Sequence, residues 1–393
     1  MFFELSPEQA KLRDDLRAYL TSKLTPEMRE KLGPRPAEHC GPEYRAFIRQ
    51  MGADGWLGVG WPVEYGGKGF SFIEEYIYLD ECRRADAPIP LVTIQTVGPT
   101  LMHHGSEEQK SSFLPRIVRG EIHFAIGYTE PSAGTDLASL RTRAVRDGEH
   151  YIVNGQKIFT TGAHDADFIW LAARTAPDAP KHKGLTIFIV DASLPGISMT
   201  PIHTLDDGRT NAVYFSDVRV PASAIVGGEN EGWRLITTQL NHERVALACS
   251  GKAEALYEET LAWARAASTP DGGRVLDRPW VRLALAEVRA RLNALELLNW
   301  RMVWAMTQDT LRPEDASVVK VYGTETQVWV FRTLLEVIGQ AGTLQEGSPD
   351  AVLRGRVDLA YRWSLVLTFG GGVNEIQREI IAVAGLGMPR GRR

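Results

Sequence analysis

The chain has 393 residues, of which 44% are apolar and 24% are charged, and its formal net charge is −5. These values are typical of a globular protein with enough apolar side chains for two or three domains. Because the net charge is negative and the Lys and Arg residues are scattered, the sequence excludes the basic surface by which proteins bind nucleic acid.

No apolar run approaches the roughly 18 residues of a membrane span, and the first residues form a charged helical pattern unlike a signal peptide. We therefore expect a cytoplasmic protein that does not enter a membrane. Cys40, Cys82 and Cys249 are far apart in the sequence and lack Cys-x-x-Cys spacing. The sequence thus predicts neither a disulfide framework nor a metal site.

Residues 1–121 have the pattern of an α-helical domain. Ser6 is a candidate helix cap, and Leu12, Leu16 and Leu20 follow it at helical spacing. Similar periodicity predicts further helices at 42–55, 70–88 and 106–118. A Gly- and Pro-rich turn at 58–70 interrupts them.

The pattern changes at residues 122–227, where short β-prone segments alternate with Gly, Pro, Asp and Asn. We expect a middle β-domain, a barrel or a sandwich. Residues 228–393 return to helical periodicity, at 230–267, 277–308, 313–340 and 355–385, with lengths that suit a four-helix bundle. The order α, β, α predicts an α+β protein of three domains.

Five motifs, in order along the whole chain, resemble the acyl-CoA dehydrogenase family. They are "GWPVEYGG" (60–67), "IGYTEPSAGTDLASL" (126–140), "NGQKIFTTGA" (154–163), "YFSDVRVP" (214–221) and "GGGVNEIQREII" (370–381). The segments "QLNHERVAL" (239–247) and "LTFGGGVNEIQR" (367–378) resemble the members that degrade steroid side chains. The resemblance implies a dehydrogenase that uses FAD to form an α,β double bond in an acyl-CoA thioester.

The first β-domain motif also has a physical interpretation. A strand that runs into a Gly-rich turn presents backbone N–H groups and hydroxyls in one concavity, which suits a diphosphate. The resemblance assigns Gly134 and Thr135 to the FAD pyrophosphate and Tyr128 and Thr129 to the flavin end. An ordinary strand and turn, with Thr present for its β-propensity, is the alternative for this segment.

The second β-domain motif completes the expected flavin contacts. The resemblance implies that Thr161 hydrogen-bonds the flavin near N5 and that Phe159 packs against the ring, in place of the usual Trp. The glycines of "FGGGV" (369–373) lack the Gly-x-Gly-x-x-Gly spacing and follow a helical pattern, which argues against a Rossmann nucleotide site.

The reaction needs a carboxylate that removes the α-proton and donors for the thioester oxygen. Most of the family places its Glu at the position of Gly371, so the usual base is absent here. A minority places it on the helix after the β-domain, where this chain has Glu243. We predict Glu243 as the base and expect Gly371 and Gly372 to widen the acyl pocket and offer backbone N–H groups. The alternative for Glu243 is a solvated helix surface.

A second departure concerns the residues with which the family clasps a neighbouring subunit's FAD. The expected Arg-x-x-Phe-Gly turn is "TPDGG" (269–273), Trp280 replaces a Gln, and Glu336 brings a negative charge toward a pyrophosphate. We therefore expect an α2β2 heterotetramer with a related chain and two FAD, instead of a homotetramer with four.

Three alternatives for function follow from the same residues. In the first, the chain is a catalytic dehydrogenase that passes electrons to an electron-transferring flavoprotein. In the second, it is a non-catalytic subunit that binds acyl-CoA and FAD beside a catalytic paralogue. In the third, it is a flavin oxidase on the same fold. No residue argues for the oxidase, and fold alone does not decide between them.

Overall fold

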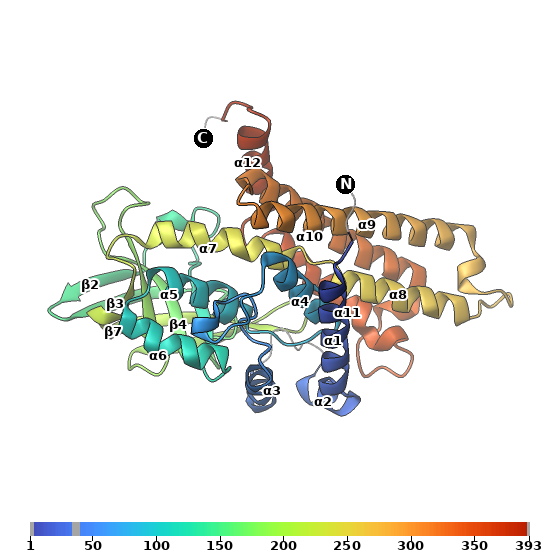
Figure 1. Ribbon diagram of the computed structural model, residues 1–393, viewed down its shortest axis with the longest axis horizontal. Coiled ribbons are helices and arrows are strands. Elements are labelled where there is room, and N and C mark those ends of the chain that lie inside the picture. Colours follow the sequence, from blue (N-terminus) through green and yellow to red (C-terminus); the bar gives the residue numbers. More distant parts are fainter. Residues whose placement is uncertain (1–3, 34–39, 391–393) are drawn as a thin grey trace. The chain divides into compact units, whose positions relative to one another are not determined.

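The computed structural model describes residues 4–33 and 40–390, apart from the side chains of 240–247. Its contacts divide the chain into two compact units (Figure 1). The first contains Met1–Pro34, Ser71–Ala87 and Arg244–Arg393, and the second contains Arg35–Phe70 and Pro88–Glu243. The helices of the first third of the chain are therefore divided between the two units.

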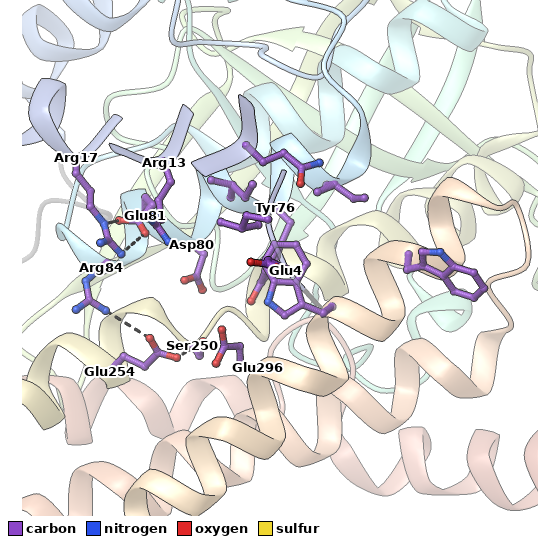
Figure 2. A pocket seen from close by; sticks show the side chains of 16 residues that line it. Glu4, Arg13, Arg17, Tyr76, Asp80, Glu81, Arg84, Ser250, Glu254 and Glu296 are labelled. Carbon is purple, nitrogen blue, oxygen red and sulfur yellow. Dashed lines mark hydrogen bonds and ion pairs between the residues drawn. The ribbon is translucent and has the colours of Figure 1, made fainter. Parts of the chain in front are cut away.

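The first unit is helical. Its helices are α1 (Pro7–Lys23), α2 (Pro26–Leu32), α4 (Phe72–Arg84), α8 (Gly251–Ala266), α9 (Pro279–Thr307), α10 (Pro313–Ile338), α11 (Arg356–Ser364) and α12 (Asn374–Ile380). At the start of α1, Ser6 and Gln9 exchange hydrogen bonds between side chain and backbone, a capping box that the sequence predicts. Arg17 on α1 then pairs with buried Glu81 on α4 at 2.7 Å, which ties the two helices together (Figure 2).

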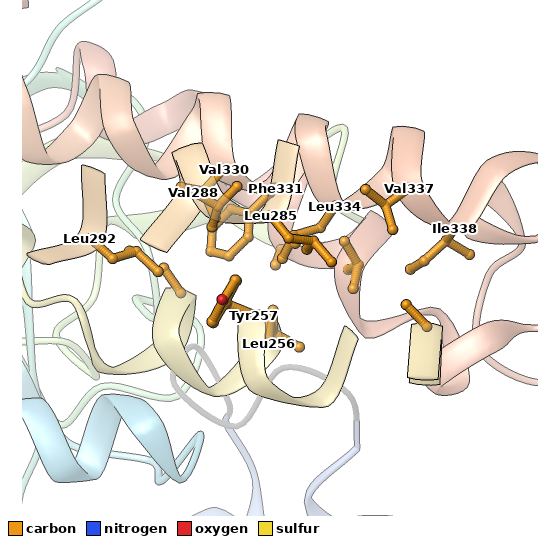
Figure 3. Packing of buried hydrophobic residues seen from close by; sticks show 14 of the residues in the cluster. Leu256, Tyr257, Leu285, Val288, Leu292, Val330, Phe331, Leu334, Val337 and Ile338 are labelled. Carbon is orange, nitrogen blue, oxygen red and sulfur yellow. The ribbon is translucent and has the colours of Figure 1, made fainter. Parts of the chain in front are cut away.

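The hydrophobic core of this unit lies among α8, α9 and α10 (Figure 3). Leu285, Val288 and Leu292 recur at intervals of three and four residues, which places them on one face of α9. They pack in one buried cluster with Leu256 of α8 and Phe331 of α10. The long apolar periodicities of the C-terminal third therefore form a helical bundle.

One long helix expected at 230–267 is instead two helices, α7 (Gly232–Leu247) and α8. At the start of α8, the Gly251 amide donates to the Asp80 carboxylate on α4 over 2.9 Å. A Cβ on Gly251 would lie 2.2 Å from the Asp80 carbonyl oxygen. This close approach to α4, made by residues far away in the sequence, accompanies the break between the two helices.

The second unit is built around an eight-stranded sheet in the order β6-β7-β3-β2-β4-β5-β8, with β1 parallel to β4. The strands are β1 (Phe124–Gly127), β2 (Arg143–Asp147), β3 (His150–Lys157), β4 (Phe168–Arg174), β5 (Leu185–Asp191), β6 (Ile197–His203), β7 (Arg209–Pro221) and β8 (Ile225–Val226). Its helices are α3 (Pro42–Ala53), α5 (Gly98–His104), α6 (Glu107–Val118) and nearly all of α7. Helix α5 follows a π-helical turn, Val92–Val97, and lies in a stretch for which the sequence predicts no helix.

Burial along the strands distinguishes the centre of the sheet from its edge. Every residue of β5 except Asp191 is buried, whereas no residue of β6 is. β5 and its neighbour β4, in which every residue but the first and last is buried, are therefore covered on both faces, whereas the sheet edge at β6 is open to solvent within this chain. In the part of the chain that the structure describes, no helix has the length and apolar character needed to cross a bilayer.

Candidate functional site

A buried ion pair joins the two sequence motifs of the β-domain. Lys157, at the end of β3, places its Nζ 2.8 Å from Glu130 Oε1 and 3.0 Å from the carbonyl oxygen of Tyr128. The Glu130 carboxylate also accepts the backbone N–H groups of Arg141 at 2.6 Å and Thr142 at 2.8 Å. The Glu130 carboxylate therefore joins the two ends of the loop that follows β1, and Lys157 fixes this loop to β3.

The electrostatics of this pair keep both groups charged near neutral pH. Burial lowers the pKa of Lys157 to about 8, and the Glu130 carboxylate opposes the shift. Burial raises the pKa of Glu130, but the charge and hydrogen bonds of Lys157, together with the backbone donors, outweigh it and lower that pKa. The sequence analysis did not single out either residue, although each lies inside one of the two β-domain motifs.

The loop that this pair holds contains Gly134 and Thr135. Glu130 and Ala133 exchange two backbone hydrogen bonds of 3.1 Å, which form a tight turn just before them. Gly134 and Thr135 are both exposed, and a Cβ on Gly134 would meet no atom within 4 Å. The two residues assigned to the pyrophosphate thus lie on a firmly anchored loop whose outer side is open.

The remaining flavin-contact candidates come together at the ends of β1 and β3. The Ile158 amide donates to the carbonyl oxygen of Thr129 over 2.8 Å, and the Thr161 amide donates to that of Phe159 over 3.1 Å. The Thr161 hydroxyl lies 3.2 Å from the Thr210 hydroxyl. Thr129, Phe159 and Thr161 therefore share one location in the folded β-domain.

Phe159 has two unusual properties at this location. Its φ is +58°, in the left-handed region that residues other than glycine rarely adopt, and its side chain is 59% exposed. Strained backbone of this kind persists where the surrounding structure enforces it, often at binding sites. An exposed aromatic ring held in this way fits a group with a flat face, and the hydroxyls of Thr129 and Thr161 beside it fit the polar edge of a flavin ring.

Tyr128 does not share this exposure. Its hydroxyl accepts a hydrogen bond from Trp170 Nε1 at 3.0 Å and donates to Gln239 Oε1 on α7. The Gln239 amide group in turn donates to the Thr100 hydroxyl on α5 over 2.8 Å. The Tyr128 hydroxyl is thus part of a buried hydrogen-bond network, and Gln239 is a residue that the sequence analysis did not identify.

The proposed base, Glu243, lies on α7 four residues after Gln239. Its side chain lies outside the described residues, so its contacts and its protonation do not enter the description of the site.

Gly371 and Gly372 lie in the helical unit and interrupt the single helix expected at 355–385. Their φ angles are +65° and +100°, and a Cβ on Gly372 would lie 2.8 Å from Gln377 Nε2. The fully buried Lys320 of α10 donates to the Gly372 carbonyl oxygen at 2.6 Å and to Asn374 Oδ1 at 2.7 Å. Both glycines are therefore favoured by the backbone conformation, and hydrogen bonds from Lys320 Nζ hold the turn.

The helical unit also contains a cavity of about 250 Å³ between α1, α4, α8 and α9 (Figure 2). Asp80, Glu254 and Glu296 line it together with the aromatic rings of Tyr76 and Trp300. Burial raises the pKa of Asp80 to about 7, with the Glu254 charge adding to the shift. The fold therefore keeps a carboxyl group there that titrates near neutral pH.

Comparison with known protein families identifies the family to which the chain belongs. Three family models cover most of the chain, namely the acyl-CoA dehydrogenase N-terminal domain at residues 6–121, the middle domain at 125–218 and the C-terminal domain at 230–386. The chain belongs to the acyl-CoA dehydrogenase family. The family and the α+β fold predicted from the sequence are thereby confirmed, and with them the class of enzyme.

Individual relatives resemble the chain over its whole length. Acyl-CoA dehydrogenase FadE29 of Mycobacterium tuberculosis is 53% identical, with 99% of each chain covered, and FadE26 of the same organism is 48% identical, with 100% of each covered. Among solved structures, the Tcur3481-Tcur3483 steroid ACAD matches with a TM-score of 0.94 at 50% identity, covering 100% of both chains. The ChsE4-ChsE5 complex from M. tuberculosis matches with a TM-score of 0.93 at 49% identity, again over 100% of both chains.

Proposed function

We propose that this acyl-CoA dehydrogenase binds FAD in its own β-domain and uses Glu243 to desaturate an acyl-CoA thioester. The observation that carries the proposal is the cluster of Thr129, Phe159 and Thr161, with its exposed aromatic ring on strained backbone, fixed by the Lys157–Glu130 ion pair. A bound flavin would supply the acceptor for the β-hydride.

The residues of this chain divide the remaining work. The anchored loop at Gly134 and Thr135 binds the pyrophosphate through backbone N–H groups and a hydroxyl. Phe159 packs against the ring system and excludes water from one of its faces, while the hydroxyls of Thr129 and Thr161 orient its polar edge. The contacts that this chain makes with the flavin in its own site thereby come from the β-domain.

Proton removal is assigned to α7 and the glycine turn. Glu243 takes the α-proton as general base. The backbone N–H groups of Gly371 and Gly372 stabilise the negative charge that develops on the thioester oxygen. We assign a steroid side-chain CoA ester as substrate, supported by the steroid ACAD to which the chain is similar.

The partner is a related acyl-CoA dehydrogenase chain in an α2β2 heterotetramer. Trp280 is 48% exposed, and Glu336 is exposed and pairs with Arg332 at 3.4 Å. The Glu336 carboxylate would repel the phosphates of a neighbour's FAD, and the Trp280 ring would fail to bind them. Two similar solved structures carry paired chain names, which supports a hetero-oligomer here. An electron-transferring flavoprotein would accept the electrons.

The test is anaerobic bleaching of the bound flavin by acyl-CoA, comparing wild type with Glu243→Gln. We expect the bleaching rate to fall about 10³-fold, within the range that general bases contribute. Glu231→Gln is the matched control, because Glu231 is an exposed glutamate directly before α7. Unchanged bleaching in Glu243→Gln would place the base in the partner and leave this chain a non-catalytic subunit.

The same preparation tests the substrate and the assembly. A steroid side-chain acyl-CoA should bleach the flavin faster than a straight-chain acyl-CoA, and the purified complex should contain two FAD per four chains. Four tightly held FAD in a tetramer of this chain alone would contradict the heterotetramer. Rapid reoxidation of the reduced flavin by air would favour an oxidase over a dehydrogenase.

A further inference from the structure

A directed hydrogen-bond chain crosses the interior of the second unit. Trp170 Nε1 is only a donor, so the Tyr128 hydroxyl accepts from it at 3.0 Å and uses its own proton for Gln239 Oε1. The Gln239 amide N–H then meets the Thr100 hydroxyl at 2.8 Å, whose proton goes to the Thr96 carbonyl oxygen at 2.6 Å. The Gln239 amide thus accepts at Oε1 and donates at Nε2, which fixes its orientation.

This hydrogen-bond chain is buried and joins four elements of the unit. Trp170 is fully buried, and Tyr128, Gln239 and Thr100 are 8%, 4% and 6% exposed. Trp170 lies in β4, Tyr128 follows β1, Thr100 lies in α5 and Gln239 lies in α7. In such an environment an unpaired polar group costs about 1–3 kcal/mol, so the network defines one favourable depth and rotation for α7.

The position of Gln239 gives this constraint a chemical consequence. Glu243 follows Gln239 by four residues, which is one helical turn and about 6 Å along the axis. Tyr128 is fixed at its other end as well, because its carbonyl oxygen accepts from Lys157 Nζ at 3.0 Å. Its neighbour Thr129 belongs to the flavin-contact cluster.

We propose that Gln239 is a positioning residue, which sets the place of Glu243 relative to the flavin site by hydrogen bonding α7 to Tyr128 and Thr100. The proposal rests on the assignment of Glu243 as base. The network links the helix that carries the base to the strand end that holds the flavin, through one tyrosine. A displacement of a reacting group by about 1 Å can lower a rate by about 100-fold, so this link controls the chemical step.

The experiment is a double-mutant cycle with Tyr128→Phe, Gln239→Met and the combined variant in the full complex. Four quantities are measured: FAD content, the visible flavin spectrum, acyl-CoA affinity and the single-turnover rate of anaerobic bleaching. We expect the first three to stay close to wild type while the bleaching rate falls about 10-fold to 100-fold in each single variant. Because both changes break the same link, the combined variant should be no slower than the slower single variant.

A matched control removes a buried tyrosine hydroxyl elsewhere in the same sheet. Tyr151→Phe in β3 makes the same chemical change at a residue that is 1% exposed, and it should leave the bleaching rate unchanged. Parallel losses of FAD content, affinity and rate in the Gln239 variant, or rate effects that multiply in the combined variant, would overturn the positioning role in favour of a general structural one. Wild-type rates in both single variants would also overturn it.

The outcome for Glu243→Gln separates this inference from the function on which it rests. If Glu243→Gln abolishes bleaching while the Gln239 and Tyr128 variants bleach normally, only the positioning role fails. If Glu243→Gln bleaches like wild type, the assignment of the base fails first.

Discussion

Replacing Lys157 with Met should destabilise the β-domain by about 3 kcal/mol, at the lower end of the range for breaking a buried ion pair. The magnitude follows from what remains after the change. Lys157 is fully buried and Glu130 is 5% exposed, so the carboxylate stays desolvated when its cation is removed. It keeps the two backbone donors from Arg141 and Thr142, which limits the loss.

An exposed ion pair made by Asp136 of the same loop provides the control. Lys181 pairs with Asp136 at the same 2.8 Å, but the two side chains are 52% and 55% exposed. Lys181→Met should therefore cost less than about 1 kcal/mol. Urea unfolding followed by β-sheet circular dichroism gives both values, and FAD content should fall only in Lys157→Met. The combined variant Lys157→Met/Glu130→Gln should recover part of the loss, since the buried charge is then gone.

Equal and small effects of Lys157→Met and Lys181→Met would refute the reasoning that burial decides the strength of the two pairs. A full loss of FAD with unchanged unfolding free energy would instead assign Lys157 to direct cofactor contact.

Two carboxyl groups of the helical unit should give opposite pH dependences. Burial of Asp86 is outweighed by Lys252 and Arg356, which lower its pKa to about 2 from 3.8, so about 2 kcal/mol of stability is present above pH 3.8 and is lost as the pH falls through 2. Asp86→Asn should flatten that acid limb in a pH series of unfolding free energies. Burial raises the pKa of Asp80 to about 7, so its contribution is complete below pH 3.8 and declines as the pH rises through 7. Asp80 lines the cavity, where solvent would screen its charge and reduce the effect. We therefore expect Asp80→Asn to be more stable than wild type by about 2 kcal/mol at pH 8 and equal to it at pH 3.5. Urea titrations of both proteins at the two pH values measure the difference.

Local chemistry made several elements predictable from the sequence. Ser6 and Gln9 form the expected capping box because both partners lie within one helical turn. The strand pattern after residue 122 and the helical periodicities after 277 correspond to the observed sheet and bundle. The motifs at Thr129 and Phe159 were expected to act together, and the short hydrogen bond from the Ile158 amide places them side by side.

Features that depend on distant partners were not predictable in this way. The Lys157–Glu130 pair and the Tyr128–Gln239 bond join residues that are 27 and 111 positions apart, and neither has a periodic signal. The break before Gly251 likewise involves α4, which contacts it from the other end of the chain. A single sequence contains the residues of such contacts but does not state which ones meet.

The left-handed backbone at Phe159 has a consequence for reading related sequences. The conformation costs a residue with a Cβ about 1–2 kcal/mol, and glycine would avoid that penalty. The chain nevertheless retains a large ring there, more than half exposed to solvent. Stability alone does not favour such a residue, and the proposed contact of its ring with a flavin would account for it. A paralogue that has ceased to hold flavin is free to relax this position, and the residue found there becomes an indicator of which chains of a mixed tetramer still bind their own cofactor.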